Sequence, residues 1–214
     1  MPALPFRHVA IDGPIGVGKT SLVNLLTKRF RGTKILEDAD NPFLDDFYKD
    51  KRGAAFRTEL FFLLSRYKQQ QELVQRQLFQ QTTLVDYVFE KSRLFAYLNL
   101  DDSELMIYDK LYSLLSESVP RPDLIVYLQA PTEVLLKRVK ARGRPEETQL
   151  SEEYLAEVNR AYNHYFFHYT QTPLLVVNTE GVDFARSEED VADLLKQIRT
   201  MGKGTQYYVP RVRA

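Results

Sequence analysis

Residues 13–20, GPIGVGKT, constrain the fold of this chain more than any other segment. They match the pattern G-x-x-x-x-G-K-[ST], with an apolar, strand-like run before them and the helix-like run SLVNLL after them. Glycines let backbone N–H groups converge on phosphate oxygens, and the N-terminus of the following helix adds partial positive charge. Lys19 can reach the β- and γ-phosphates of a nucleotide, and the Thr20 hydroxyl can ligate Mg²⁺.

This motif predicts a site for a nucleoside triphosphate, with ATP as the expected donor and Mg²⁺ as its ion. The predicted nucleotide-binding residues are Gly13, Pro14, Ile15, Gly16, Val17, Gly18, Lys19, Thr20 and Ser21. The alternative is a glycine-rich turn with an exposed lysine, and the agreement of motif and context weighs against it. The motif alone does not distinguish hydrolysis, transfer and switching.

Short apolar runs alternate with longer helical patterns, which predicts parallel β-α units and an α/β fold. Strands are expected at residues 6–12, 33–37, 83–86, 123–129 and 173–178. Helices are expected from Lys19 onward and at residues 54–80, 88–98, 103–118, 131–142, 151–169 and 188–200. The strands are mostly apolar, so we expect a five-stranded parallel sheet between two layers of helices. Ligands of such sheets bind beyond the carboxyl ends of the strands.

Composition narrows the class of protein and its partners. The 214 residues suit a single domain over 1–214, and 29 basic residues balance 29 acidic ones. Nucleic-acid affinity depends on neutralising phosphates with Lys and Arg, so no nucleic-acid polymer is expected as a partner. The absence of Cys excludes disulfides and a Cys nucleophile. No apolar run approaches the ~18 residues of a membrane helix, and the start lacks a signal-peptide layout, so we expect a cytoplasmic protein without a membrane partner.

Two carboxylates are predicted at strand ends that face the same crevice. Glu37 ends the second predicted strand, where it could accept the proton of an attacking hydroxyl. Asp86 ends the third, where an acid could order Mg²⁺ or its water. A capping or surface acid remains the alternative for Glu37. A turn acid that bonds its own backbone remains the alternative for Asp86.

Three arginines lie in the segment of residues 138–150, which we interpret as a lid. Arg138 and Arg142 are four residues apart on one helix face, and Arg144 follows after a glycine. Such a lid could fold over the triphosphate and neutralise the charge that spreads onto the transferred group. The alternative is a solvated helix face, because Glu133 and Lys137 form an ordinary i,i+4 pair.

The sequence resembles the deoxyribonucleoside kinases over about residues 6–185. The resemblance rests on five segments: GPIGVGKTS, LEDADNPFLDDFY, FFLLSRY, PDLIVYLQAPTEVLLKRVKARGRPEE and EVNRAYNHYFFHY. The phosphate loop is common to many families, whereas the acid followed by NPF and the RGRPEE lid are more specific. The resemblance implies a P-loop kinase fold and transfer of the ATP γ-phosphoryl group to the 5′-hydroxyl of a deoxyribonucleoside, expected to be a purine one, in nucleotide salvage.

The resemblance also implies roles for individual residues. It makes Glu37 the base for the 5′-hydroxyl, with Lys19 and the lid arginines as the other catalytic groups. Tyr48 and Glu147 match the pair that holds the sugar 3′-hydroxyl, and Arg66 matches an arginine beside the nucleobase. Asp86 begins a motif that usually reads acid-Arg-Ser and belongs to the substrate site. The family is usually dimeric through helices, which implies a homodimer.

Two positions depart from the family pattern. Tyr87 stands where an arginine usually follows the acid, so we expect a cation from elsewhere, Lys91 or Arg93, to steady Glu37 and the phosphates. Glu59 stands where a glutamine usually grips the base. An ionised Glu only accepts hydrogen bonds, which would favour guanine, whereas adenine would suit only a protonated Glu. A salt bridge between Glu59 and Arg66 is the alternative.

Two rival functions remain open from the sequence. A nucleoside monophosphate kinase of thymidylate type has a similar PDL…RGR segment. Such an enzyme commonly carries an arginine close after the acid that corresponds to Glu37, and this chain has none there. A nucleotide-binding regulator without catalysis is suggested by Tyr87 and Glu59.

The basic, aromatic tail of residues 202–214 is expected to be flexible or to dock on a partner subunit.

Overall fold

The computed structural model of the chain describes residues 4–30, 32–38, 40–76, 82–182, 184 and 187–210. Its centre is a parallel sheet with the strand order β2-β3-β1-β4-β5-β6. The strands are β1 (His8–Asp12), β2 (Thr33–Ile35), β3 (Thr83–Val85), β4 (Leu124–Gln129), β5 (Leu174–Asn178) and β6 (Thr205–Tyr208). In β1, Ala10 pairs with Val85 of β3 on one side and with Ile125 of β4 on the other. The predicted parallel α/β sheet is confirmed, with six strands instead of five.

The extra strand comes from residues 205–208, within the tail of residues 202–214. Residues 205–208 extend the sheet beside β5, with Leu174 opposite Thr205. Its side chains alternate between exposed and half-buried, and Tyr208 packs against the core. A polar strand of four residues gives too few alternations for a sequence pattern to separate it from a loop.

The helices are close to the predicted ranges. They are α1 (Lys19–Phe30), α2 (Leu44–Tyr48), α3 (Ala54–Arg76), α4 (Lys91–Asn99), α5 (Asp102–Ser116), α6 (Thr132–Arg142), α7 (Glu152–Phe167) and α8 (Glu188–Thr200), with a short 3₁₀ turn η2 (Pro145–Glu147) in the lid. The last residues of the predicted helix 54–80 lie outside the described ranges. The short α2 was not predicted. None of the helices in the described part of the chain is long and apolar enough to cross a membrane.

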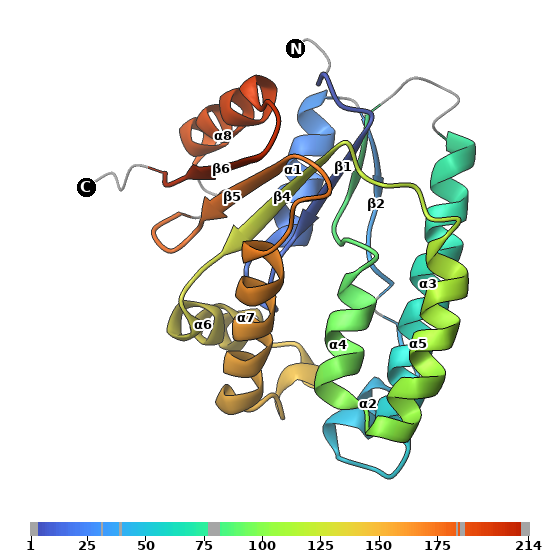
Figure 1. Ribbon diagram of the computed structural model, residues 1–214. Helices are drawn as coiled ribbons and strands as arrows, with labels where there is room; N and C mark the ends of the chain where they lie inside the picture. The colour runs from blue at the N-terminus through green and yellow to red at the C-terminus, as the bar shows by residue number, and fades with distance from the viewer. Residues whose placement is uncertain are drawn as a thin grey trace.

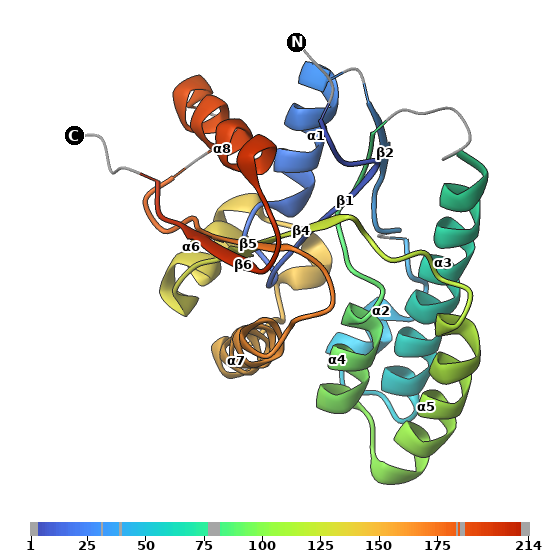
Figure 2. The same ribbon diagram turned by 45° about the horizontal axis from the view of Figure 1, so that its top comes forward.

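The sheet is covered on both faces, as expected for apolar strands (Figure 2). Along β4, Val126 and Leu128 face the core under α1, α6 and α8, whereas Ile125 and Tyr127 face the core under α4 and α7. A further core joins α3, α4 and α5 around Leu63, and these helices stand beside the sheet in Figure 1. The three layers leave the carboxyl ends of the strands directed towards α6 and the lid.

Candidate active site

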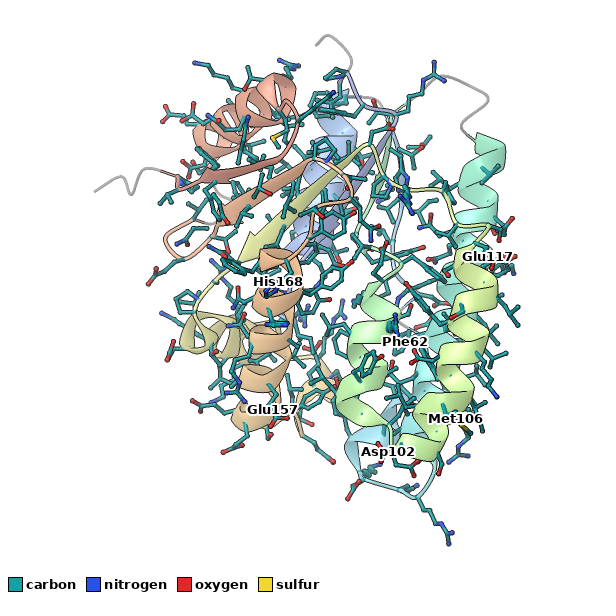
Figure 3. The ribbon with its side chains drawn as sticks, viewed as in Figure 1. Phe62, Asp102, Met106, Glu117, Glu157 and His168 are labelled. Atoms are coloured by element: carbon teal, nitrogen blue, oxygen red, sulfur yellow. The ribbon has the colours of Figure 1, made fainter. Side chains whose placement is uncertain are left out.

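A cavity of about 340 Å³ lies at the carboxyl ends of the strands. Its walls come from the phosphate loop, the segment after β2, α2, α3, α4, the lid and α7. Among its lining residues are Lys19, Thr20, Glu37, Tyr48, Glu59, Phe62, Arg66, Asp86, Lys91, Phe95, Arg142, Arg144, Glu147 and Tyr154. Figure 3 marks Phe62 among the side chains between α3 and α4. The structure therefore brings most of the predicted site residues to one cavity.

The phosphate loop has the tight backbone that its glycines permit. Gly13 and Gly16 have φ angles of 153° and 84°. A Cβ on Gly13 would lie 2.2 Å from the Leu128 carbonyl oxygen, so only glycine fits there. The Lys19 ammonium group donates hydrogen bonds to the carbonyl oxygens of Gly13 at 2.7 Å and Pro14 at 3.1 Å. Burial, and then the nearby charge of Lys91, lower the pKa of Lys19 to about 8.

Thr20 and Asp86, the two predicted metal ligands, are in direct contact. The Thr20 hydroxyl donates to Asp86 Oδ2 at 2.7 Å, and the backbone N–H of Glu37 donates to Asp86 Oδ1 at 2.6 Å. Oxygen ligands suit Mg²⁺, which usually takes one or two protein ligands besides phosphate and water. A cluster of three or more His, Asp or Glu side chains that could hold a metal by itself does not occur in the described ranges. The pair fits an ion that arrives with a nucleotide.

Glu37 is held by two cations. The Arg66 guanidinium donates to Oε1 from Nε at 2.8 Å and from Nη2 at 2.6 Å. The Lys91 ammonium group donates to Oε2 at 2.6 Å. Burial alone would raise the pKa of the Glu37 carboxyl, but Lys91 and Arg66 outweigh it and hold the pKa well below its ordinary value. Glu37 is therefore an ionised carboxylate that faces the cavity.

The two cations that the sequence offered as partners of Glu37 have different contacts. Lys91 contacts Glu37, whereas Arg93 donates to Asp109 on α5 at 3.0 Å. Tyr87 is fully buried, and its hydroxyl donates to Gln69 at 2.8 Å. Of the two cations suggested by the sequence, the structure brings Lys91 to Glu37.

The three lid arginines have different partners in the structure. Arg142 forms an ion pair with Glu147, and Arg144 lines the cavity. The Arg138 guanidinium donates to the carbonyl oxygens of Thr179 at 2.5 Å and Val182 at 3.0 Å, and Arg138 is not among the residues that line the cavity. The spacing of Arg138 and Arg142, four residues apart on one helix face, did not indicate that the loop after β5 binds Arg138.

Glu59 and Arg66 do not form the salt bridge considered above. The Glu59 carboxyl oxygen Oε1 accepts a hydrogen bond of 2.7 Å from Asn99 Nδ2. Arg66 also donates from Nη1 to Ser92 Oγ at 2.8 Å, and its guanidinium lies 5.1 Å from the centre of the Phe62 ring. Arg66 therefore lies beside Glu37 in this structure, where the resemblance had implied a place beside the nucleobase.

Asp12 and Asn99, which bond to residues of the site, were not predicted from the sequence. Asp12 ends β1 in complete burial, accepting hydrogen bonds from the backbone N–H groups of Gly13 at 2.7 Å and Val88 at 2.9 Å. Burial raises its pKa. An acid directly before the phosphate loop was the available signal. Asn99, the partner of Glu59, is the last residue of α4, and nothing in the sequence pattern predicted its contact with α3.

The parallel sheet, phosphate loop and carboxylate at the end of β2 together define a P-loop phosphotransferase. More narrowly, the chain belongs to the deoxynucleoside kinase family, whose sequence model matches residues 9–202. It is 33% identical to the deoxyguanosine kinase of Bacillus subtilis (strain 168), over 94% of this chain and 99% of that protein. It is 35% identical to the deoxyadenosine kinase of Dictyostelium discoideum, over 91% of this chain and 80% of that protein.

Solved structures support the fold. The deoxyadenosine kinase from M. mycoides with bound dCTP superposes with a TM-score of 0.72 at 23% identity, covering 88% of this chain and 96% of that chain. The predicted resemblance and the P-loop kinase fold are thus confirmed. Family membership also confirms the predicted activity, phosphorylation of a deoxynucleoside with ATP as the donor.

Proposed function

We propose that the chain transfers the γ-phosphoryl group of ATP to the 5′-hydroxyl of a purine deoxyribonucleoside, with Glu37 as the base. The observation that carries this proposal is the position of Glu37 in the same cavity as Lys19, Thr20 and Asp86. A hydroxyl bonded to Glu37 would face the γ-phosphate of a nucleotide held by the loop. Deoxynucleoside monophosphate would be the product, as in nucleotide salvage.

The hydrogen bonds of Glu37 leave room for this hydroxyl. Oε1 accepts two bonds from Arg66, whereas Oε2 accepts one from Lys91, and a carboxylate oxygen can accept two. The 5′-hydroxyl is proposed to donate to Oε2. A weakly basic carboxylate suffices there, because the transition state of phosphoryl transfer is loose and catalysis depends mainly on position and charge.

The proposed phosphate site combines charges from both ends of the cavity. Lys19 would contact the β- and γ-phosphates, and Thr20 with Asp86 would hold Mg²⁺, which neutralises phosphate charge when bound. Arg144 and Arg142 would complete the site from the lid. For Arg142 this requires leaving Glu147, whose carboxylate would then be free to bind the 3′-hydroxyl together with Tyr48. The ion pair of Arg142 and Glu147 is proposed as the resting arrangement of the lid.

The base would lie among aromatic side chains at the far end of the cavity. Phe62, Phe95 and Tyr154 line the cavity together with Glu59, and flat aromatic rings suit stacking on a base. The two relatives described above are named for deoxyguanosine and deoxyadenosine, which supports a purine acceptor here. Since the donor is ATP, we propose the cytoplasm as the compartment of the reaction.

A homodimer is the proposed assembly. On α3 and α5, which lie side by side in both ribbon views, exposed apolar side chains project from the molecule: Leu64, Val74, Met106, Ile107 and Leu114. Leu114 is 70% exposed and Met106 is 58% exposed. A gathering of large apolar side chains on neighbouring helices is typical of a protein–protein interface.

The test is ADP release from ATP with a panel of acceptors. Purine deoxynucleosides should give turnover, whereas their 2′,5′-dideoxy analogues, which lack the reacting hydroxyl, should give none. The corresponding monophosphates serve as the second control. Turnover with monophosphates only, or ATP binding without acceptor-dependent ADP release, would contradict the proposal.

A further inference from the structure

Glu59 brings an incompletely bonded carboxyl group to the wall of the cavity. Its side chain is 2% exposed and lies on α3, one turn before Phe62. Oε1 accepts the bond from Asn99 Nδ2, whereas Oε2 is buried and has no hydrogen-bond partner among the residues that the structure describes. A buried acceptor without a partner costs free energy, so Oε2 is the atom where a proton or a ligand donor is needed.

Asn99 decides which oxygen carries the proton when the group is neutral. Oε1 already accepts an N–H, so a hydroxyl hydrogen on Oε1 would meet that donor, whereas Oε2 is unopposed. The neutral form therefore presents a donor at Oε2 and an acceptor at Oε1, which keeps a second lone pair. The ionised form presents acceptors at both oxygens.

The groups that face Glu59 keep both forms accessible near neutral pH. Burial raises the pKa of Glu59 to about 7, Asn99 and the charges of Arg66 and Lys91 lower it, and Glu37 raises it. Tyr108 on α5 and Tyr154 on α7 also face the group, and their own pKa values are raised by burial and then by its charge. Arg66 makes no ion pair with Glu59 and instead bonds to Glu37 and Ser92.

We propose that the protonation state of Glu59 selects which purine the site accepts; this inference rests on the proposed function. The ionised carboxylate matches guanine, whose N1–H and 2-amino group offer two adjacent donors. The neutral carboxyl matches adenine, whose N1 accepts from Oε2–H while its 6-amino group donates to Oε1. The opposite pairings leave a buried donor or acceptor unpaired, which is the kind of mismatch that a closed site rejects strongly.

A specific dependence on pH follows. The share of enzyme ready for deoxyadenosine rises with proton concentration, and the share ready for deoxyguanosine falls. The ratio of kcat/KM for deoxyadenosine to kcat/KM for deoxyguanosine is then proportional to proton concentration. It should fall about tenfold for each unit by which the pH rises. The slope is the same above and below the pKa of Glu59, because the ratio of the two kcat/KM values depends only on the ratio of neutral to ionised Glu59.

The experiment is a competition in one vessel. Equal concentrations of deoxyadenosine and deoxyguanosine are offered with ATP between about pH 6 and 8.5, and the two monophosphate products are quantified. Effects of pH on Lys19, Glu37 or ATP are common to both products and cancel in their ratio. The wild-type ratio should fall about tenfold per pH unit, and in Glu59→Gln, which cannot titrate, it should be independent of pH. A flat wild-type ratio, or the same slope in both proteins, would overturn the inference.

Asn99→Ala provides a second variant. Removing the N–H that lowers the pKa of Glu59 should shift the product ratio towards deoxyadenosine at every pH while the slope is kept. An unchanged ratio would count against the inference, since loss of packing alone would lower both products together.

Calorimetry gives a readout independent of turnover. At pH 7, deoxyadenosine binding should take up about half a proton and deoxyguanosine binding should release about half a proton. Heats measured in buffers of different ionisation enthalpy report these values, and no exchange of protons with either ligand would overturn the inference.

Turnover confined to pyrimidine deoxynucleosides would overturn the inference and leave kinase activity standing. No turnover with any deoxynucleoside would overturn the proposed function as well.

Discussion

At the scale of single residues, the site is organised around a carboxylate that two cations keep ionised. Glu37 lies between Arg66 and Lys91, and its pKa is held well below the ordinary value although burial acts in the opposite direction. A base with a lowered pKa contributes above that pKa and is lost as pH falls through it. Glu37 should therefore be ready to bind a hydroxyl throughout the physiological pH range.

Lys91 offers a direct test of this balance. In Lys91→Met, Glu37 keeps its burial but loses one cation, so its pKa should rise by about 1–3 units. The acid limb of kcat/KM should move upward by the same amount. Lys91→Arg keeps the charge and is the matched control, with the acid limb of the wild type. A wild-type pH profile in Lys91→Met would contradict this account.

The residues that could be predicted are those tied to strand ends. Lys19, Thr20, Glu37 and Asp86 directly follow strands or the loop, so a correct reading of the parallel sheet already brings them together. The partners of Arg138 and Glu59 could not be predicted in this way. They depend on how the loop after β5 and the end of α4 pack against other elements, which a local pattern does not contain.

At the scale of elements, the phosphate loop is packed tightly against α6. A Cβ on Gly16 would lie 2.8 Å from Val139 Cγ2 and 2.9 Å from the Leu135 carbonyl oxygen. Gly18 also has a positive φ angle, 105°, but a Cβ there would meet no atom within 4 Å. Both glycines have a strained backbone for any other residue, but only Gly16 lies against α6. Comparing them therefore distinguishes backbone strain from contact with α6.

Replacing each glycine by alanine should therefore have unequal effects on stability. Gly18→Ala carries backbone strain of about 1 kcal/mol, whereas Gly16→Ala adds a clash and should cost about 2–4 kcal/mol. Thermal unfolding without nucleotide measures the difference, with the melting temperature of Gly16→Ala the lower by several degrees. Equal melting temperatures would show that α6 yields and does not fix the loop.

Long elements were predictable and short ones were not. Five strands and most helices follow from apolar runs and helical periodicity, because each spans several repeats of its pattern. The five-residue α2 and the four-residue β6 offer about one turn and two alternations. Their formation depends on what they pack against: β6 on the open edge of β5, and α2 on α3 and the lid.

At the scale of the whole molecule, the proposed dimer surface lies on α3 and α5, the same α3 that carries Glu59 and Arg66. Leu114→Glu would place a charge on this surface and should convert the dimer to a monomer, as measured by light scattering. Tyr207→Glu, at an exposed position of β6, is the control and should keep twice the mass of one chain. A wild-type protein that is monomeric at micromolar concentration would contradict the proposed assembly.

The central claim is that Glu37 receives the proton of a 5′-hydroxyl, and one comparison tests it most directly: the rate of deoxynucleoside-dependent ADP release in wild type and in Glu37→Gln. The amide keeps the shape of the side chain but cannot take the proton, so the rate should fall by about 10²–10⁴. Binding of a non-hydrolysable ATP analogue should persist. A Glu37→Gln protein that binds the analogue and retains the wild-type rate would contradict the account.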